Sequence, residues 1–177
     1  MSGNPKRNII LCGFMATGKS TIGKRLSERM HFRFLDMDAL IEKETGTTIP
    51  EIFATRGEPA FRALEDGLVD RIAGWTGYVV ATGGGTIVNP KNLQKLKDCG
   101  VVISLKADIQ TILLRTGKED TRPMLKGGDK LERIRRLLEL REPFYAQADI
   151  VLDTSPLAVD QVLDFLEEQL RKFGYGV

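Results

Sequence analysis

Five short apolar runs are spaced along the chain, and segments with helical periodicity lie between them. The runs span 9–12, 32–35, 78–81, 101–105 and 150–152. A short, almost wholly apolar run is typical of a strand that is buried on both faces. Strands that alternate with helices indicate one parallel sheet covered on both sides. The pattern therefore predicts an α/β fold, a five-stranded parallel sheet flanked by helices.

The helical segments are predicted by apolar spacing and by their first residues. Segment 19–30 has Ile22, Leu26 and Met30 at helical spacing, and further helices are expected at 90–98, 108–115, 130–142 and 157–173.

Three more helices are predicted between the second and third strands, at 39–44, 49–54 and 58–72. Thr48 and Glu51 form a candidate capping box, and Pro59 suits a first helical turn. A crossover connection between two parallel strands needs fewer residues than this. We therefore expect one domain of 177 residues in which 39–72 is an inserted set of substrate-binding helices at the carboxyl ends of the strands.

Residues 13–20, GFMATGKS, match the phosphate-binding pattern G-x-x-x-x-G-K-[ST] between the first strand and the next helix. Glycines let successive N–H groups turn toward an anion, which the positive end of the helix also attracts. Lys19 would reach the β and γ phosphates of ATP, and the Ser20 hydroxyl would bind Mg²⁺. A chance glycine-rich turn is the alternative. The candidate ATP contacts here are Gly13, Ala16, Thr17, Gly18, Lys19, Ser20 and Thr21.

Two carboxylates, Asp36 and Asp38, follow the second strand. Residues i and i+2 of an extended strand point the same way, so both are expected beside the phosphate-binding loop. Asp36 would hold hydrated Mg²⁺, and Asp38 would accept a proton from the attacking hydroxyl or orient it. Alternatively, Asp38 only caps a helix that begins at Ala39.

Three consecutive glycines, Gly83, Gly84 and Gly85, follow the third strand. They would let backbone N–H groups approach the acceptor or the γ-phosphate, although a loose turn is the alternative. Two arginines lie on predicted helices: Arg62, which Glu65 can orient from the same face, and Arg141. By themselves these arginines are ordinary solvated charges.

The segment 116–129 has three glycines, one proline and several charges without apolar periodicity. It is either a plain connector or a mobile lid that would deliver Arg122 to the transferring phosphoryl group. We favour the lid.

Composition limits the classes of binding partner that are expected. The chain has 26 basic and 24 acidic residues and no long basic block, which argues against nucleic-acid and membrane partners and favours a small-molecule substrate. The segment 1–6 lacks the apolar stretch of a signal peptide, so a cytoplasmic protein is expected, with a monomer as the default. Cys12, Cys99 and His31 have no partners spaced for a metal site, and we expect buried or half-buried thiols and no catalytic histidine.

Six segments in this order resemble those of shikimate kinases, small P-loop enzymes related to nucleoside-monophosphate kinases. They are GFMATGKST, FLDMD, TGTTIPEIFATRGEPAFRALE, ATGGG, RTGKEDTRPML and REPFYAQAD, and the resemblance runs from about residue 8 to residue 153. It implies that ATP, with Mg²⁺, phosphorylates the 3-hydroxyl of shikimate to give shikimate 3-phosphate and ADP, a step toward chorismate and the aromatic amino acids.

The resemblance also implies residue roles. Asp38 would bind the shikimate hydroxyls, and Arg62 and Arg141, held by Glu65, would bind its carboxylate, as suits the guanidinium fork. The remaining roles are the lid arginine for Arg122, adenine stacking for Arg115 and Pro156, lining of the shikimate pocket for Phe53 and Phe61, and the border of the acceptor and γ-phosphate for Gly83, Gly84 and Gly85.

Two departures from the family pattern stand out. Many relatives have glycine where this chain has Ala16, and we expect alanine to serve because no positive φ is demanded there. The stretch after Asp153 is short, which weakens the role of Pro156.

Two other functions remain open at this stage. The first is another small-molecule kinase of the same fold, such as a gluconate or nucleoside-monophosphate kinase. The second is an ATP-binding regulator without transfer chemistry, which should lack at least one of Lys19, Asp38, Arg62, Arg122 and Arg141; this chain has all five.

Overall fold

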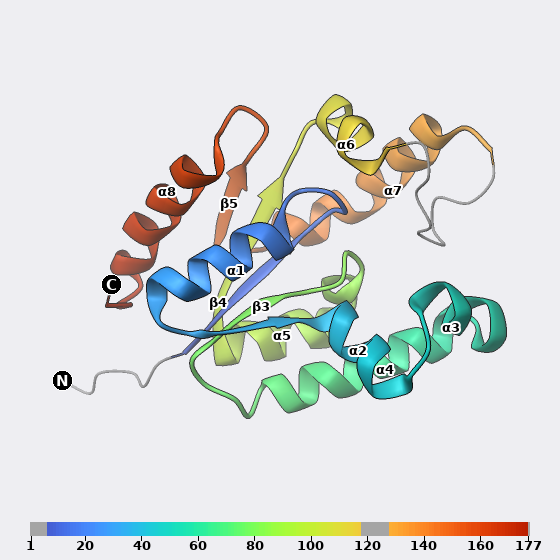
Figure 1. The fold of residues 1–177 in the computed structure, drawn as a ribbon, viewed down its shortest axis with the longest axis horizontal. Helices are drawn as coiled ribbons and strands as arrows, with labels where there is room; N and C mark the ends of the chain where they lie inside the picture. The colour runs from blue at the N-terminus through green and yellow to red at the C-terminus, as the bar shows by residue number, and fades with distance from the viewer. Residues whose placement is uncertain (1–6, 118–127, 177) are drawn as a thin grey trace.

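Five parallel strands form a single sheet in the order β2-β3-β1-β4-β5 (Figure 1). The structure is a computed structural model that describes residues 7–117 and 128–176. The strands are β1 (Asn8–Gly13), β2 (Arg33–Asp36), β3 (Tyr78–Ala81), β4 (Gly100–Lys106) and β5 (Ile150–Asp153). The predicted five-stranded parallel sheet is confirmed.

Each face of the sheet has its own core because neighbouring side chains of a strand point to opposite sides. On β1, Ile9 and Leu11 join one buried cluster, whereas Ile10 and Cys12 join the other. The helices α1 (Lys19–Met30) and α8 (Val159–Lys172) supply the first cluster. The second is covered by α2 (Met37–Thr45), α3 (Ile49–Arg56), α4 (Glu58–Ile72), the 3₁₀ turn η1 (Thr86–Val88), α5 (Pro90–Cys99), α6 (Ile109–Thr116) and α7 (Lys130–Tyr145).

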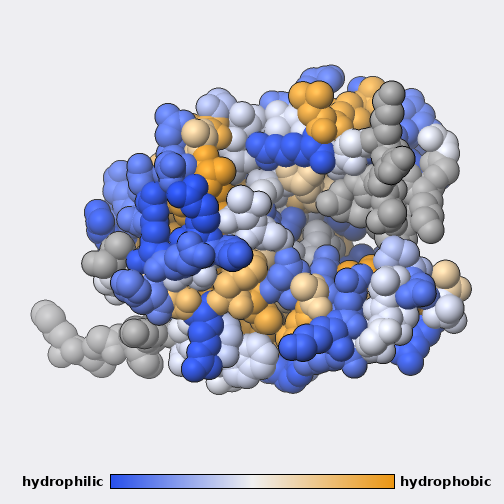
Figure 2. All heavy atoms as spheres, viewed as in Figure 1, coloured by the Kyte–Doolittle hydropathy of each residue, from blue (hydrophilic) through white to orange (hydrophobic). Residues whose placement is uncertain are grey.

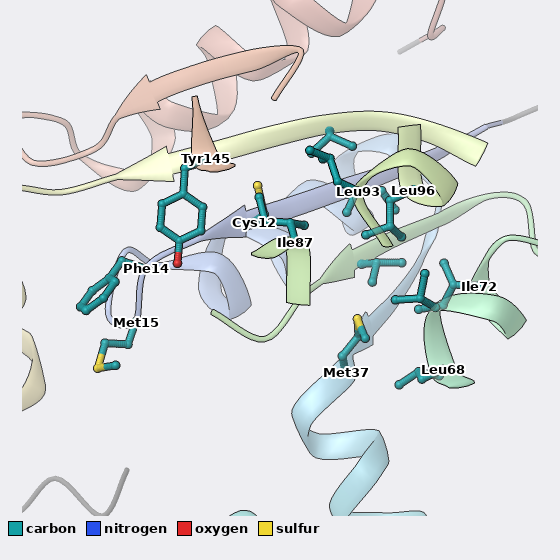
Figure 3. Close-up of a cluster of buried hydrophobic side chains, with 14 of the residues drawn as sticks. Cys12, Phe14, Met15, Met37, Leu68, Ile72, Ile87, Leu93, Leu96 and Tyr145 are labelled. Carbon is teal, nitrogen blue, oxygen red and sulfur yellow. The ribbon is translucent and has the colours of Figure 1, made fainter. Parts of the chain in front are cut away.

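The second core extends beneath the phosphate-binding loop (Figure 3). The ring of Tyr145 lies there near Phe14 and Cys12. Burial raises the pKa of the Cys12 thiol to about 12, so this thiol is inert at neutral pH. Cys99 is half-buried, and both cysteines are free, as expected.

Local signals in the sequence mark several helix starts correctly. Thr48 and Glu51 form the predicted capping box of α3, and Pro59 lies in the first turn of α4. The side chains of Asn89 and Asp108 cap α5 and α6 by accepting backbone N–H bonds. His31 is the C-cap of α1 and has a left-handed φ of 53°.

Several helix bounds differ from the prediction by a few residues, and two of these differences have a capping or tertiary reason. The helix α2 begins at Met37 rather than Ala39, because Asp36 acts as its N-cap. The helix α7 continues through Pro143 to Tyr145, whose buried side chain is anchored by a hydrogen bond to the glycine turn. In the described part of the chain, no helix has the length and apolar character that a membrane span requires.

The helices α2–α4 pack against one another; α2 and α3 lie beyond the ends of β2 and β3, and α4 runs back along the sheet and packs against α5 (Figure 1). The molecular surface is hollowed between this group and the part formed by α6 and α7 (Figure 2). The fold therefore places the predicted site at the carboxyl ends of the strands, where open α/β sheets bind ligands.

Candidate active site

The phosphate-binding loop connects β1 directly to α1. Gly13 has a φ of 137°, and a Cβ there would lie 2.2 Å from the carbonyl oxygen of Leu105. Gly18, with a φ of 96°, is the N-cap of α1. Both positions need glycine, one for space and backbone conformation and the other for conformation. The loop thus has the geometry of an anion-binding nest at a helix N-terminus.

The expectation about Ala16 is wrong, because the backbone of this residue has a φ of 60°. From the sequence, alanine is expected to serve here because no positive φ is demanded, but the loop imposes a left-handed conformation that disfavours a Cβ. Its carbonyl oxygen accepts a hydrogen bond of 3.0 Å from Nη1 of Arg115.

Lys19 crosses the loop that precedes it. Its Nζ donates to the carbonyl oxygens of Gly13 and Phe14 at 2.9 and 2.8 Å. The hydroxyl of Thr17 also donates to Phe14, at 2.8 Å. These bonds hold the ammonium group over the loop, where phosphates would bind.

Ser20 and Asp36 form a second feature beside the loop. The Ser20 hydroxyl donates to Oδ2 of Asp36 at 2.6 Å, while Oδ1 accepts the backbone N–H of Ala39 at 3.1 Å. The alternative that Asp38 caps α2 is therefore wrong, because Asp36 is the cap. Asp38 lies in the first turn of the helix and not in an extended strand, so the i, i+2 argument was wrong as well. Both carboxylates nevertheless border the same cavity.

Asp38 has the electrostatics of a proton acceptor. Burial, followed by the nearby carboxylates of Glu65 and Asp36, raises its pKa to about 6, and Lys19 opposes this shift. Its Oδ1 is buried and has no hydrogen-bond partner among the described residues. A buried carboxylate oxygen without a donor is costly unless a ligand supplies one.

The three glycines make room for side chains from other elements. A Cβ on Gly83 would lie 2.5 Å from Oε1 of Glu65, and one on Gly85 would lie 2.6 Å from Nη1 of Arg62. A Cβ on Gly84 would lie 3.0 Å from Nη1 of Arg141. The sequence predicted close approach of a ligand to this turn, whereas the structure shows that polar side chains already occupy the space beside it.

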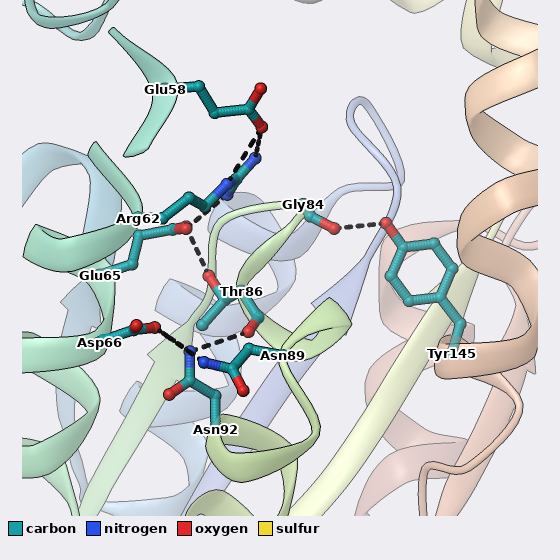
Figure 4. A network of polar contacts seen from close by, with 9 residues as sticks. All are labelled: Glu58, Arg62, Glu65, Asp66, Gly84, Thr86, Asn89, Asn92 and Tyr145. Carbon is teal, nitrogen blue, oxygen red and sulfur yellow. Dashed lines mark hydrogen bonds and ion pairs between the residues drawn. The ribbon is translucent and has the colours of Figure 1, made fainter. Parts of the chain in front are cut away.

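Arg62 is held on α4 by two carboxylates (Figure 4). One is Glu65, whose side chain is 1% exposed, and the other is Glu58, at 3.2 Å and 47% exposed. Oε1 of Glu65 also accepts the hydroxyl of Thr86 at 2.7 Å. Glu65 therefore makes the same-face contact with Arg62 that the sequence predicted.

Arg141 is buried on α7, with only 7% of its surface exposed. Its guanidinium lies 5.9 Å from the ring centroid of Phe14, and it makes no ion pair with a carboxylate in the described ranges. One turn later, Tyr145 donates a hydrogen bond of 2.6 Å to the carbonyl oxygen of Gly84. A buried cation without a protein anion is suited to bind an anionic ligand.

A cavity of about 320 Å³ brings most of the predicted residues together. The rings of Phe53 and Phe61 form part of its wall, with centroids 5.0 Å apart. Sequence analysis missed Met15, Ile49 and Thr82, which also line it; the place of Thr82 directly before the glycines was the available signal. The predicted residues at this cavity are Ala16, Gly18, Lys19, Ser20, Thr21, Asp36, Asp38, Phe53, Phe61, Arg62, Glu65, Gly83, Gly84, Gly85 and Arg141.

A second cavity, of about 240 Å³, lies on the other side of the loop. It is lined by Thr17, Thr21 and Arg115, among others, but not by Pro156, which is exposed. Arg122 falls outside the described residues, as does most of the predicted lid.

The class of protein follows from how these features are joined. A loop with the geometry to bind a triphosphate opens directly into a cavity with room for one small molecule, at the carboxyl ends of a β2-β3-β1-β4-β5 sheet. This is the arrangement of a P-loop kinase that acts on a small acceptor.

Comparison with known proteins identifies the family. The shikimate kinase family model matches residues 15–171. A shikimate kinase of Caldanaerobacter subterraneus subsp. tengcongensis is 44% identical over 94% of this chain and 96% of its own length. The chain belongs to the shikimate kinase family and is an ATP-dependent kinase.

Solved structures agree with this assignment. The shikimate kinase of Acinetobacter baumannii in complex with shikimate has a TM-score of 0.90 and 34% identity, covering 94% of each chain. The shikimate kinase of Aquifex aeolicus has a TM-score of 0.83 and 32% identity, covering 96% of this chain and 99% of its own.

Proposed function

We propose that this enzyme transfers the γ-phosphate of ATP to the 3-hydroxyl of shikimate, releasing shikimate 3-phosphate and ADP. The observation that carries the proposal is the polarity of the acceptor cavity. Two guanidinium groups, those of Arg62 and Arg141, lie beside the glycine turn, and the same cavity is lined by Asp38, whose buried Oδ1 has no hydrogen-bond partner among the described residues. A ligand that has one carboxylate and several hydroxyls complements both.

Each group of the acceptor would have a defined partner. Arg62 and Arg141 would bind the carboxylate through charge-assisted hydrogen bonds. The rings of Phe53 and Phe61 would pack against the carbon ring of the acceptor. Asp38 would accept a hydrogen bond from the attacking hydroxyl and take its proton as the O–P bond forms.

The nucleotide would be bound by the loop and the residues around it. Backbone N–H groups and Lys19 would contact the β and γ phosphates, and Arg115 would stack on adenine. Arg122, from the segment 116–129, would meet charge on the transferring phosphoryl group, and closure of this segment would exclude water.

The pair of Ser20 and Asp36 fits a magnesium site. One hydroxyl and one carboxylate oxygen, 2.6 Å apart, are hard oxygen donors, and they leave room for the waters and phosphate oxygens that Mg²⁺ prefers. No group of three His, Cys, Asp or Glu residues with metal-binding geometry occurs within 7–117 and 128–176. When bound, Mg²⁺ would neutralise charge on the phosphate oxygens.

Three further expectations belong to the proposal. The protein would be a cytoplasmic monomer, its single domain would bind the acceptor through residues 39–72, and its partners would be small molecules only. The modest net charge of +2 supports the last of these.

The decisive measurement is ADP release from Mg-ATP with shikimate present, with shikimate omitted, and with gluconate or AMP in its place. We expect turnover with shikimate only. Turnover with another acceptor would retain the kinase and refute the substrate. ATP binding without turnover on any acceptor would instead favour a regulator.

A further inference from the structure

The hydroxyl of Thr86 is placed to control how the acceptor's carboxylate is bound. Thr86 begins the 3₁₀ turn η1 directly after the three glycines, and it is 1% exposed. Its Oγ1 donates to Oε1 of Glu65 at 2.7 Å, and Oε2 of the same carboxylate accepts from Arg62 (Figure 4). We infer that Thr86 is a positioning residue that acts through Glu65 to aim Arg62 at the carboxylate of the acceptor.

Glu65 depends on the Thr86 hydroxyl because it is buried. Within the described residues, its side chain accepts hydrogen bonds from Thr86 and Arg62, one to each oxygen. Removal of either donor would leave a buried carboxylate oxygen unsatisfied, which is more costly than the loss of an exposed hydrogen bond. The carboxylate would then move, and Arg62 would move with it.

Arg62 has a competing partner on the outer side of α4. Nε and Nη2 donate to Oε1 of Glu58 at 3.3 and 3.2 Å, and Glu58 is nearly half exposed. The guanidinium therefore lies between a buried carboxylate on the cavity side and an exposed one. Because Thr86 holds the buried partner in place, it biases the guanidinium toward the cavity.

Thr86 is itself fixed from the core. Nδ2 of Asn92, a residue that is 2% exposed, donates to the Thr86 carbonyl oxygen at 3.1 Å and to Oδ1 of Asp66 at 2.7 Å. This amide joins η1 and α5 to α4, the helix that also bears Glu65 and Arg62. Thr86 on η1 and Glu65 on α4 are thus joined a second time, through the hydrogen bonds of Asn92.

The inference rests on the proposed function, since it assigns the carboxylate of that acceptor to Arg62. Its test compares shikimate with shikimate methyl ester, which lacks the anionic carboxylate. For each variant, the ratio of kcat/KM for the acid to kcat/KM for the ester measures how strongly the carboxylate is recognised.

Thr86→Val keeps the shape of the side chain and removes the donor. We expect it to raise the KM for shikimate about tenfold and to lower the acid-to-ester ratio by about the same factor, since the lost bond involves a charged group. The KM for ATP should not change. Thr86→Ser, which retains a hydroxyl, should restore the ratio.

Thr45→Val is the matched control. Among the residues that the structure describes, the Thr45 hydroxyl donates only to backbone carbonyl oxygens, those of Ile41, Glu42 and Thr47 in and after its own helix. Loss of this hydroxyl should leave the acid-to-ester ratio at the wild-type value.

An unchanged ratio in folded Thr86→Val would overturn the inference, as would equal losses in Thr86→Val and Thr45→Val. If Thr86→Val does not fold, a crystal structure of the wild type with shikimate decides instead: the bond from Thr86 to Glu65 must persist while Arg62 contacts the carboxylate, and its absence would overturn the inference. Failure of the proposed function is seen separately, as absence of wild-type turnover with shikimate.

Discussion

Ala16 is a strained residue in the phosphate-binding loop. It is one of two described residues other than glycine with a positive φ, the second being His31 at the end of α1. A left-handed conformation costs an alanine about 1 kcal/mol relative to glycine, because its Cβ crowds the carbonyl oxygen. The loop keeps this conformation because its backbone must turn N–H groups toward the phosphates.

Ala16→Gly should therefore raise the free energy of unfolding by about 1 kcal/mol, with little effect on kcat. Thermal unfolding without ligands measures this. Ala63→Gly, on the exposed face of α4, is the control and should lower stability by a similar amount, because glycine disfavours a helix interior. If both substitutions lower stability, Ala16 is not strained by its positive φ.

Asp38 should link activity and stability to pH in opposite directions. Its pKa is raised from 3.8 to about 6, so the folded protein holds a proton here that the unfolded chain loses at lower pH. Between these two values, the contribution of Asp38 to stability falls as the pH rises. Activity should instead rise with pH through about 6, because the proton acceptor that we propose is the ionised carboxylate.

Asp38→Asn should abolish most turnover and raise stability at pH 7 by roughly 2 kcal/mol. Steady-state kinetics and chemical unfolding at pH 5 and pH 7 measure both effects. The gain in stability should be smaller at pH 5. A variant that turns over at the wild-type rate would remove the acceptor role of Asp38.

At the scale of elements, the glycine turn after β3 connects two helices of the site, α4 and α7. It borders Glu65 and Arg62 of α4, and it borders Arg141 of α7. Tyr145 of α7 donates to its central carbonyl oxygen. The turn therefore needs glycine because side chains from two helices occupy the adjacent space.

Gly85→Ala should weaken shikimate binding. Its backbone has an ordinary φ of −102°, so the effect comes from space alone: the new Cβ would lie 2.6 Å from two nitrogens of Arg62. We expect the KM for shikimate to rise roughly tenfold, with the KM for ATP unchanged. Gly67→Ala on α4, where a Cβ meets nothing within 4 Å, should instead stabilise the protein slightly and leave both KM values unchanged.

At the scale of the whole molecule, α1 packs on one face of the sheet and α2–α4 pack on the other. Strand β1 and helix α1 carry the phosphate-binding loop, whereas the inserted helices carry the groups expected to bind the acceptor. The two meet in one cavity because the strands are parallel and end at the same edge. Substitutions on each side should therefore have separable effects.

Lys19→Ala should lower kcat by about a hundredfold or more, because it removes positive charge at the transferring phosphoryl group. Arg62→Ala should chiefly weaken shikimate binding, by roughly ten- to a hundredfold. Calorimetric titration measures the affinity for shikimate, and kinetics at saturating substrate measure kcat. Equal loss of shikimate affinity in both variants would refute the division. Arg122→Ala should resemble Lys19→Ala.

The sequence by itself determined the strands, most helices and the phosphate-binding loop, because these depend on local properties. Apolar runs such as 9–12, the motif 13–20 and the capping box of Thr48 and Glu51 act over a few residues. The family resemblance then proposed which distant residues share a site.

Only the tertiary structure decided how those distant residues meet. It placed Asp38 in a helical turn capped by Asp36, gave Ala16 a positive φ, buried Arg141, and connected Thr86 to Arg62 through Glu65. These features depend on how α4, α7 and the glycine turn pack around the sheet. Local periodicity contains no such information, because burial and electrostatic contact between separate elements arise only once the chain has folded.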